Sequence, residues 1–190
     1  MSIYQKILIP VLCLAPFAAC SDSEGGGNGG GNGEACPHDY SKFDGTSPTV
    51  SLRNDLLKAN GTFRFSCAFN RTCHGAPGQS QAQLYLGTQG EDGGASIDEM
   101  ANLVHAEIVG QPSLAAPGIP LVDPGKPETS FLMMKLDGCL DDVEAQCQGT
   151  SSRLTDHACG SLMPEGNKDP LPAVERDLIR AWIKQGAPNN

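Results

Sequence analysis

Apolar residues recur three or four positions apart in four parts of the chain, and this spacing predicts four α-helices. The first predicted helix covers residues 49–60 and ends at Gly61, where a glycine with positive φ can close a helix. The second begins at a capping box, in which Ser96 and Glu99 satisfy backbone N–H groups at the helix start, and it continues to Val109. Gly61 follows the first segment, and Gly110 and Pro112 follow the second, so the two are expected to be separate elements.

The other two predicted helices lie in the second half of the chain. The third has Pro127 at its first position, where a proline is well tolerated, and it ends at Gly138. The fourth has Val174, Leu178 and Trp182 four residues apart with Ile179 and Ile183 beside them, which indicates an amphipathic helix with these side chains on its apolar face. Glycine and proline close this last helix just before the end of the sequence.

The segment 65–85 differs from these helices. It has no sustained periodicity and is dense in Cys, Gly, Pro and Gln, so it is predicted to be a structured loop. No part of the chain alternates apolar and polar residues in a way that indicates a strand. The predicted fold class is therefore all-α, a small helical domain with long irregular loops and one core.

The N-terminus has the features of an export signal. Lys6 precedes an apolar run, and Cys20 follows two alanines and is itself followed by a Gly/Asn-rich stretch. The run is too short and too interrupted by proline to span a bilayer. The pattern resembles the lipobox and tether of bacterial lipoproteins, which implies a signal peptide (1–19), a tether (20–33) lipidated at Cys20, and a domain (34–190). We therefore expect an exported protein, anchored by lipid in the periplasm or at the outer membrane.

Charge and motif content narrow the function classes. The formal net charge is −9 and Lys and Arg form no cluster, so nucleic acid is not an expected partner. Ser, His and Asp occur in no nucleophile-elbow arrangement, and the glycine-rich tract precedes no helix that could hold a phosphate. The sequence therefore predicts a protein that is not an enzyme.

The cysteines carry most of the remaining information. Cys13 leaves with the signal and Cys20 takes lipid, so six thiols enter an oxidising compartment, where each is expected to be bonded. Six thiols allow 15 pairings, and the sequence does not choose among them. Cys139 and Cys147 bracket a short acidic stretch that a disulfide between them would close.

The most specific motif is the adjacency of Cys73 and His74, with Gly75 after them and Cys67 before them. In haem c attachment a thiol adds to a haem vinyl group, and the next residue's imidazole then ligates the iron. The usual motif has its first cysteine three residues before the second, where this chain has Asn70. The alternative is that Cys67 and Cys73 form a local disulfide.

Later segments add to this motif. Met163 is followed by proline on the loop before the last helix, and the chain closes with Trp182-Ile183-Lys184-Gln185-Gly186-Ala187. With the Cys-His-Gly motif, these features resemble the cytochrome c-like lipoproteins of Gram-negative bacteria, some of which have a stretched cysteine spacing. The stretch from Asp123 to Leu132 resembles the middle of the same proteins.

This resemblance implies a cytochrome c-like domain with one haem c per chain. Cys67 and Cys73 would form thioethers, His74 would be the proximal iron ligand, and Met163 the distal ligand, with His157 as its rival. If both cysteines bind haem, the other four make two disulfides; if neither does, all six make three.

The implied function is to carry single electrons, with a redox partner protein that has a basic patch to match the acidic surface. The alternative is a haem-free, disulfide-stapled binding or structural module on the cell envelope. A haem peroxidase would need an open sixth position, which Met163 would fill.

Overall fold

The computed structural model describes residues 36, 38–78, 83–88, 95–148, 158–165 and 170–190. Within these ranges the chain is mainly helical and contains no β-strand, only isolated β-bridges. The helical class predicted from the sequence is therefore confirmed. The α-helices are α1 (Ile97–Ile108), α2 (Phe131–Asp137) and α3 (Ala173–Lys184), and the shorter 3₁₀ and π turns are η1 (Tyr40–Lys42), η2 (Leu52–Leu56), η3 (Phe63–Cys67), η5 (Pro127–Thr129) and η6 (Asp141–Gln146).

Two of the predicted helices form nearly as expected. The capping box at the start of α1 is complete, with Ser96 and Glu99 each accepting from the other's backbone N–H. The third predicted helix is divided at Ser130 into η5 and α2, and Gly138 ends α2 in the left-handed conformation. The interruption is local, because Pro127 still stands at the first helical position of η5.

The predicted apolar face of α3 needs correction. The helix has the expected position, and Ile179, Trp182 and Ile183 are buried as predicted. Val174 is exposed, however, and residues 179–183 are buried on all sides of the helix. On α1, likewise, Leu103 is exposed and Ala101 is buried. A helical period locates an apolar face only approximately, and the neighbouring elements decide which residues are covered.

The first predicted helix is much shorter than residues 49–60. Only η2 forms there, a single π turn capped by the side chain of Ser51. Gly61 does not take a positive φ; instead, a Cβ at this position would overlap the backbone carbonyl of Leu56. The glycine is therefore needed for a close backbone approach rather than for a left-handed cap. A second turn, η3, forms where a loop was predicted, and its last residue is Cys67.

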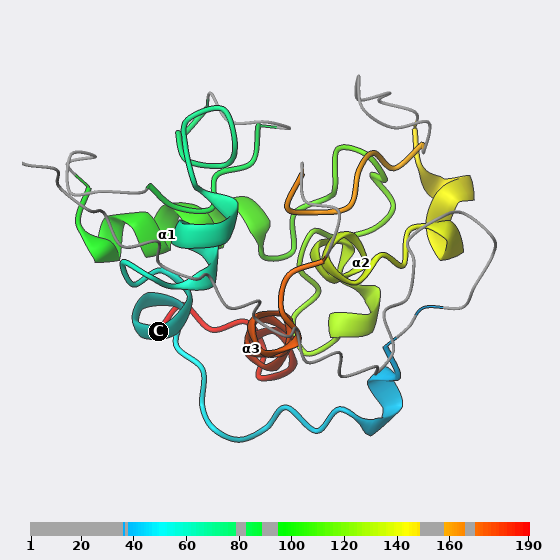
Figure 1. The fold of residues 1–190 in the computed structure, drawn as a ribbon, viewed down its shortest axis with the longest axis horizontal. Coiled ribbons are helices and arrows are strands. Elements are labelled where there is room, and N and C mark those ends of the chain that lie inside the picture. Colours follow the sequence, from blue (N-terminus) through cyan, green and yellow to red (C-terminus); the bar gives the residue numbers. More distant parts are fainter. Residues whose placement is uncertain (1–35, 37, 79–82, 89–94, 149–157, 166–169) are drawn as a thin grey trace, which may run out of the picture.

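The core is organised around α3. In Figure 1, α1 and α2 lie to the left and right of the view, and α3 lies between them. Trp182 is fully buried, and its ring meets that of Phe63 edge-on with centroids 6.0 Å apart. Beyond α3 the chain returns to η2, where the carbonyl of Asn190 accepts from the N–H of Arg53 at 3.0 Å. The C-terminal segment thus closes the domain on η2.

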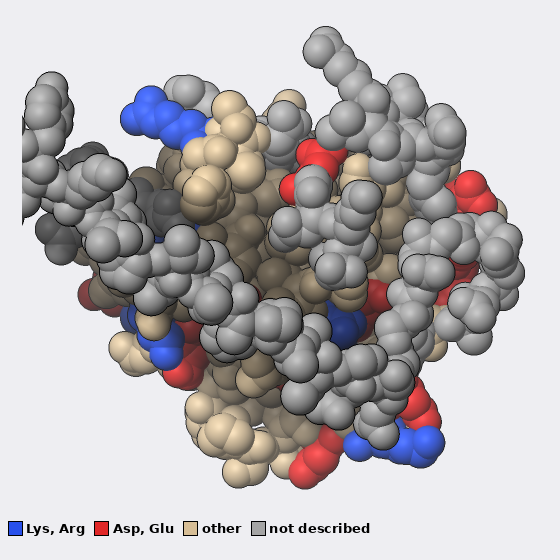
Figure 2. Space-filling view, viewed as in Figure 1, with Lys and Arg blue, Asp and Glu red and all other residues tan. Residues whose placement is uncertain are grey.

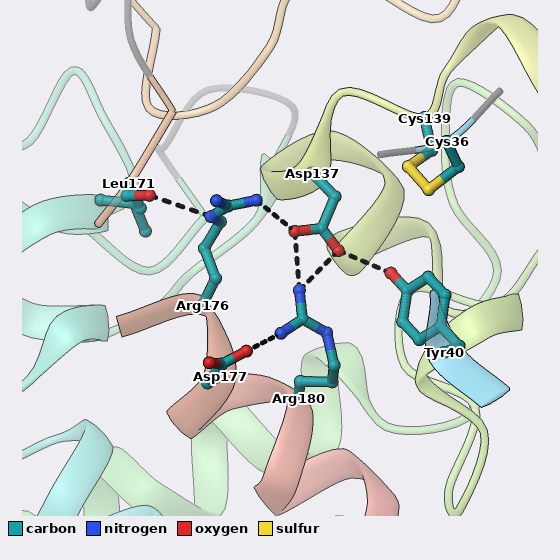
Figure 3. Close-up of polar contacts among 8 residues, drawn as sticks. All are labelled: Cys36, Tyr40, Asp137, Cys139, Leu171, Arg176, Asp177 and Arg180. Carbon is teal, nitrogen blue, oxygen red and sulfur yellow. Dashed lines mark hydrogen bonds and ion pairs between the residues drawn. A yellow bond between two sulfur atoms is a disulfide. The ribbon is translucent and has the colours of Figure 1, made fainter. Parts of the chain in front are cut away.

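A buried ion-pair network joins α2 to α3 (Figure 3). The carboxylate of Asp137 accepts from Arg176 Nη1 at 2.7 Å and from Arg180 Nη2 at 2.8 Å. It also accepts from the Tyr40 hydroxyl at 2.6 Å, and Arg180 pairs with Asp177 as well. Since Asp137 and Arg180 are both buried, this network fixes α2, α3 and η1 relative to one another.

Four of the cysteines are paired. The disulfides are Cys36–Cys139 and Cys147–Cys159, while Cys67 and Cys73 are free thiols. The sequence left the pairing open, and the possible bridge between Cys139 and Cys147 does not form. The two residues are close in sequence, but η6 separates them and each has a partner from another segment.

Several predictions fall outside the described residues. These are the signal peptide (1–19), the tether (20–33) with Cys20, and the rival ligand His157. No helix in the described part of the chain is long and apolar enough to cross a membrane.

Candidate functional site

A cavity of about 990 Å³ lies between the two halves of the chain. Its walls come from η3 and the loop after it, the end of α1, α2, and the segments 159–165 and 171–175. Most of these walls are apolar. Ligand pockets range from about 300 to 1,000 Å³, so this cavity is large enough for a sizeable organic cofactor.

The residues singled out from the sequence meet at this cavity. Cys67, Cys73, His74 and Met163 all line it, although Met163 is far from the other three in the sequence. The cavity therefore brings together two free thiols, an imidazole and a thioether sulfur. This convergence is the main feature of the site.

The loop between Cys67 and Cys73 is a closed turn. The backbone N–H of His74 donates to the carbonyl of Cys67 at 3.2 Å, which returns the Cys-His pair to the end of η3. Asn70 holds the turn, because its Oδ1 accepts from the backbone N–H groups of Thr72 and Cys73, each at 2.9 Å. Asn70 thus supports the turn at the position where the usual motif has a cysteine.

Gly75 completes the turn through its lack of a side chain. A Cβ at this position would overlap the backbone carbonyls of Asn70 and Ala68. The N–H of Gly75 also donates to the carbonyl of Asn70 at 3.1 Å. Packing of the turn therefore requires glycine at position 75.

His74 is buried, and its ring is held in one orientation. Its Nδ1 lies 3.0 Å from the carbonyl oxygen of Leu84. A carbonyl can only accept, so Nδ1 carries a proton, and in the neutral ring the lone pair is then on Nε2. A second bond, from the N–H of Leu86 to the carbonyl of His74 at 2.9 Å, fixes the backbone on the same side. This arrangement prepares Nε2 to ligate a metal, as backbone carbonyls do for other ligating histidines.

The two free thiols differ in their surroundings. Cys67 is buried at the end of η3, and burial raises the pKa of its thiol to about 12, with smaller contributions from Glu175 and Cys73. Cys73 is only partly buried. Cys67 is therefore protonated at neutral pH and protected from reagents in solution.

Met163 approaches the cavity from the segment after the second disulfide. Its backbone N–H donates to the carbonyl of Lys135 on α2 at 3.0 Å, and its side chain packs against the main core. Because the loop is tied to α2, the thioether has a defined position beside the cavity. Sulfur here is a polarisable group that suits either packing or ligation of a soft metal.

The residues around the cavity also determine what can approach it. Phe65 and Phe69 line it and are exposed, and Glu107, Glu165 and Glu175 add acidic groups. In the view of Figure 2, the visible Lys and Arg side chains lie apart from one another. The cavity thus combines an apolar rim with negative charge.

Some contributors were not identified from the sequence. Leu84 acts through its carbonyl, for which no sequence signal exists. Asn70 could have been recognised as an Asx-turn residue, two positions before Thr72. Lys135 also lines the cavity, and its position on the predicted third helix could have identified it as a contributor to the site.

Among the described residues, no three His, Cys, Asp or Glu side chains are grouped as they would be around a metal ion. Comparison of the chain with protein-family models, with curated proteins and with solved structures found no match.

Proposed function

We propose that the cavity holds a covalently attached haem c and that the protein carries single electrons at the cell envelope. The observation that supports this best is the meeting of Cys67, Cys73, His74 and Met163 around one cavity of about 990 Å³. The four other described cysteines are disulfide-bonded, which leaves these two thiols available.

The thiols suit the attachment chemistry. Each thiol adds across a vinyl group, so its sulfur bonds to one vinyl carbon and its hydrogen moves to the other; no oxidant is needed. The hydrogen bond from the His74 N–H to the Cys67 carbonyl brings the two cysteines to one wall despite their longer spacing. Two thioethers are therefore the attachment that we propose.

His74 and Met163 would bind the haem iron. The neutral ring with its proton on Nδ1 would bind the iron through Nε2, and the bond to the Leu84 carbonyl would orient the ring for this. The haem supplies the one-electron chemistry when it is bound, while the apolar walls exclude water. A neutral thioether ligand favours Fe(II) and so raises the reduction potential relative to a second histidine.

The test is expression of the exported chain together with a cytochrome c maturation system. The haem should survive acid-acetone extraction, since a thioether is covalent, and Cys73→Ser and His74→Ala should each abolish its incorporation. The reduced pyridine complex should have the band of a haem with both vinyl groups saturated; a red-shifted band would indicate attachment through Cys73 alone.

The distal ligand has its own test. Met163→Ala should remove the weak charge-transfer absorption of methionine-bound ferric haem, whereas His157→Ala should leave it. The reverse result would assign the sixth position to His157.

The proposal includes a membrane anchor at Cys20 and a basic redox partner. Cys20→Ser should move the protein from the membrane fraction to the soluble fraction. The acidic groups around the cavity suit a partner with a basic patch, and electron transfer to such a partner should slow as ionic strength rises. Unchanged fractionation of Cys20→Ser, or a rate independent of salt, would count against these parts.

The competing function is a haem-free module stapled by a bond between Cys67 and Cys73. The free state of both thiols in the structure favours the haem proposal over it. Absence of haem after expression with the maturation system, together with a Cys67–Cys73 disulfide found by mass spectrometry, would establish the competing function instead.

A further inference from the structure

Lys135 is the one Lys or Arg side chain among the described residues that line the cavity. It lies on α2, is partly buried, and its Nζ donates to the carbonyl of Cys159 at 2.8 Å. An ammonium group has three N–H donors, and this bond uses one of them. The Nζ also lies 5.9 Å from the centroid of the Phe131 ring, a cation–π distance.

The backbone at Gly160 comes close to the Lys135 ammonium. A Cβ on Gly160 would lie 3.3 Å from the Nζ, and Gly160 has a φ of +77°, which a side chain rarely adopts. A cation in such a place gains stability from an anionic group brought in by a ligand.

We propose that Lys135 binds a carboxylate of the cavity's occupant, and that this carboxylate is a haem propionate. This inference rests on the proposed function, since haem c carries two propionates and has no other anionic group. The ammonium bonds to the propionate while it keeps its bond to Cys159. It thereby orients the macrocycle in the cavity and places a positive charge near the iron.

The matched variants are Lys135→Gln, Lys135→Arg and Lys58→Gln, each expressed with the maturation system. Lys58 is exposed and does not line the cavity, so it controls for the loss of one positive charge. Lys135→Gln should shift the propionate bending mode in the resonance Raman spectrum and lower the reduction potential, because a positive charge near the iron favours Fe(II). Lys135→Arg should keep the potential closer to that of the wild type, and Lys58→Gln should change neither quantity.

A measurement on the wild-type holoprotein avoids dependence on the folding of any variant. In the reduced diamagnetic state, the ε-methylene protons of Lys135 should show a nuclear Overhauser effect to propionate methylene protons. Absence of this effect, or equal spectra and potentials for wild type and Lys135→Gln, would overturn the inference. So would a potential shift of the same size in Lys58→Gln.

Failure of the proposed function can be distinguished from failure of the Lys135 inference by whether the wild-type chain takes up haem. If the wild-type chain takes up no haem, both the electron-carrier proposal and the role of Lys135 are wrong. If haem is covalently bound but the propionate mode is insensitive to Lys135, only the role of Lys135 is wrong.

Discussion

Asn70 and Cys67 show how single residues set the geometry of the site. Asn70 stands where a haem c motif usually has its first cysteine, and its side chain accepts three hydrogen bonds, two from the backbone and one from the Thr72 hydroxyl. The turn that it holds brings His74 back to Cys67. The longer spacing between the cysteines is thus compensated by a local hydrogen-bonded turn.

Replacement of Asn70 tests this interpretation. Asn70→Ala should lower the free energy of unfolding by about 0.5–1.5 kcal/mol, because the exposed backbone N–H groups of Thr72 and Cys73 exchange this acceptor for water. Asn70→Asp keeps an acceptor oxygen in the same place and should be milder. Chemical denaturation measures both, and equal losses in the two variants would show that the acceptor is not what holds the turn.

The two free thiols should react at very different rates in protein made without the maturation system. With a pKa of about 12, Cys67 has about a thousandfold less thiolate at pH 8 than a thiol at its ordinary pKa, and it is also buried. Iodoacetamide should therefore modify Cys73 first, and Cys67 only after unfolding. Peptide mass spectrometry over time gives the order, and prompt labelling of Cys67 in folded protein would contradict its burial.

At the level of elements, the contact between α2 and α3 depends on charge as well as on apolar packing. Asp137 ends α2, Arg176 and Arg180 belong to α3, and Tyr40 lies in η1. Leu171, whose carbonyl accepts from Arg176 at 2.9 Å, also lines the cavity. The network therefore positions one wall of the site as well as the core.

Loss of the Asp137 carboxylate should be costly. Asp137→Asn leaves two guanidinium groups short of their shared countercharge, and breaking a buried pair costs about 3–5 kcal/mol. The control is Asp98→Asn, which removes the exposed partner of Arg53 and should cost less than about 1 kcal/mol. Denaturant unfolding compares the two, and similar losses would mean that the network contributes little.

At the scale of the whole molecule, the disulfides join distant parts of the chain to different extents. Cys36 and Cys139 are 103 residues apart, whereas Cys147 and Cys159 are 12 apart. The first bridge holds the N-terminal segment against the end of α2, and the second closes a local loop that leads to Met163. Their contributions to stability should differ accordingly.

Chain-entropy arguments give a value to this difference. By this argument, the first bridge stabilises the folded state by about 5 kcal/mol and the second by about 3 kcal/mol. Replacing Cys36 and Cys139 by serine should therefore lower the free energy of unfolding more than replacing Cys147 and Cys159. Denaturation of the two double variants is the measurement, and the opposite order would contradict the entropic account.

Features that depend on interactions within a few residues could be predicted from the sequence, whereas features that depend on distant segments could not. The sequence by itself determined α1, the C-terminal end of α2 and the position of α3, and it singled out the four candidate cofactor residues, because capping, helix-ending and motif signals act within a few residues. It did not determine that η2 stops after one turn, that Val174 is exposed, or that Cys139 pairs with Cys36. Only the tertiary structure decided these features, because each depends on which distant segment packs against the residue. The same holds for the meeting of Met163 with His74 and Lys135 around one cavity, which α2 and the loop of residues 159–165 bring about.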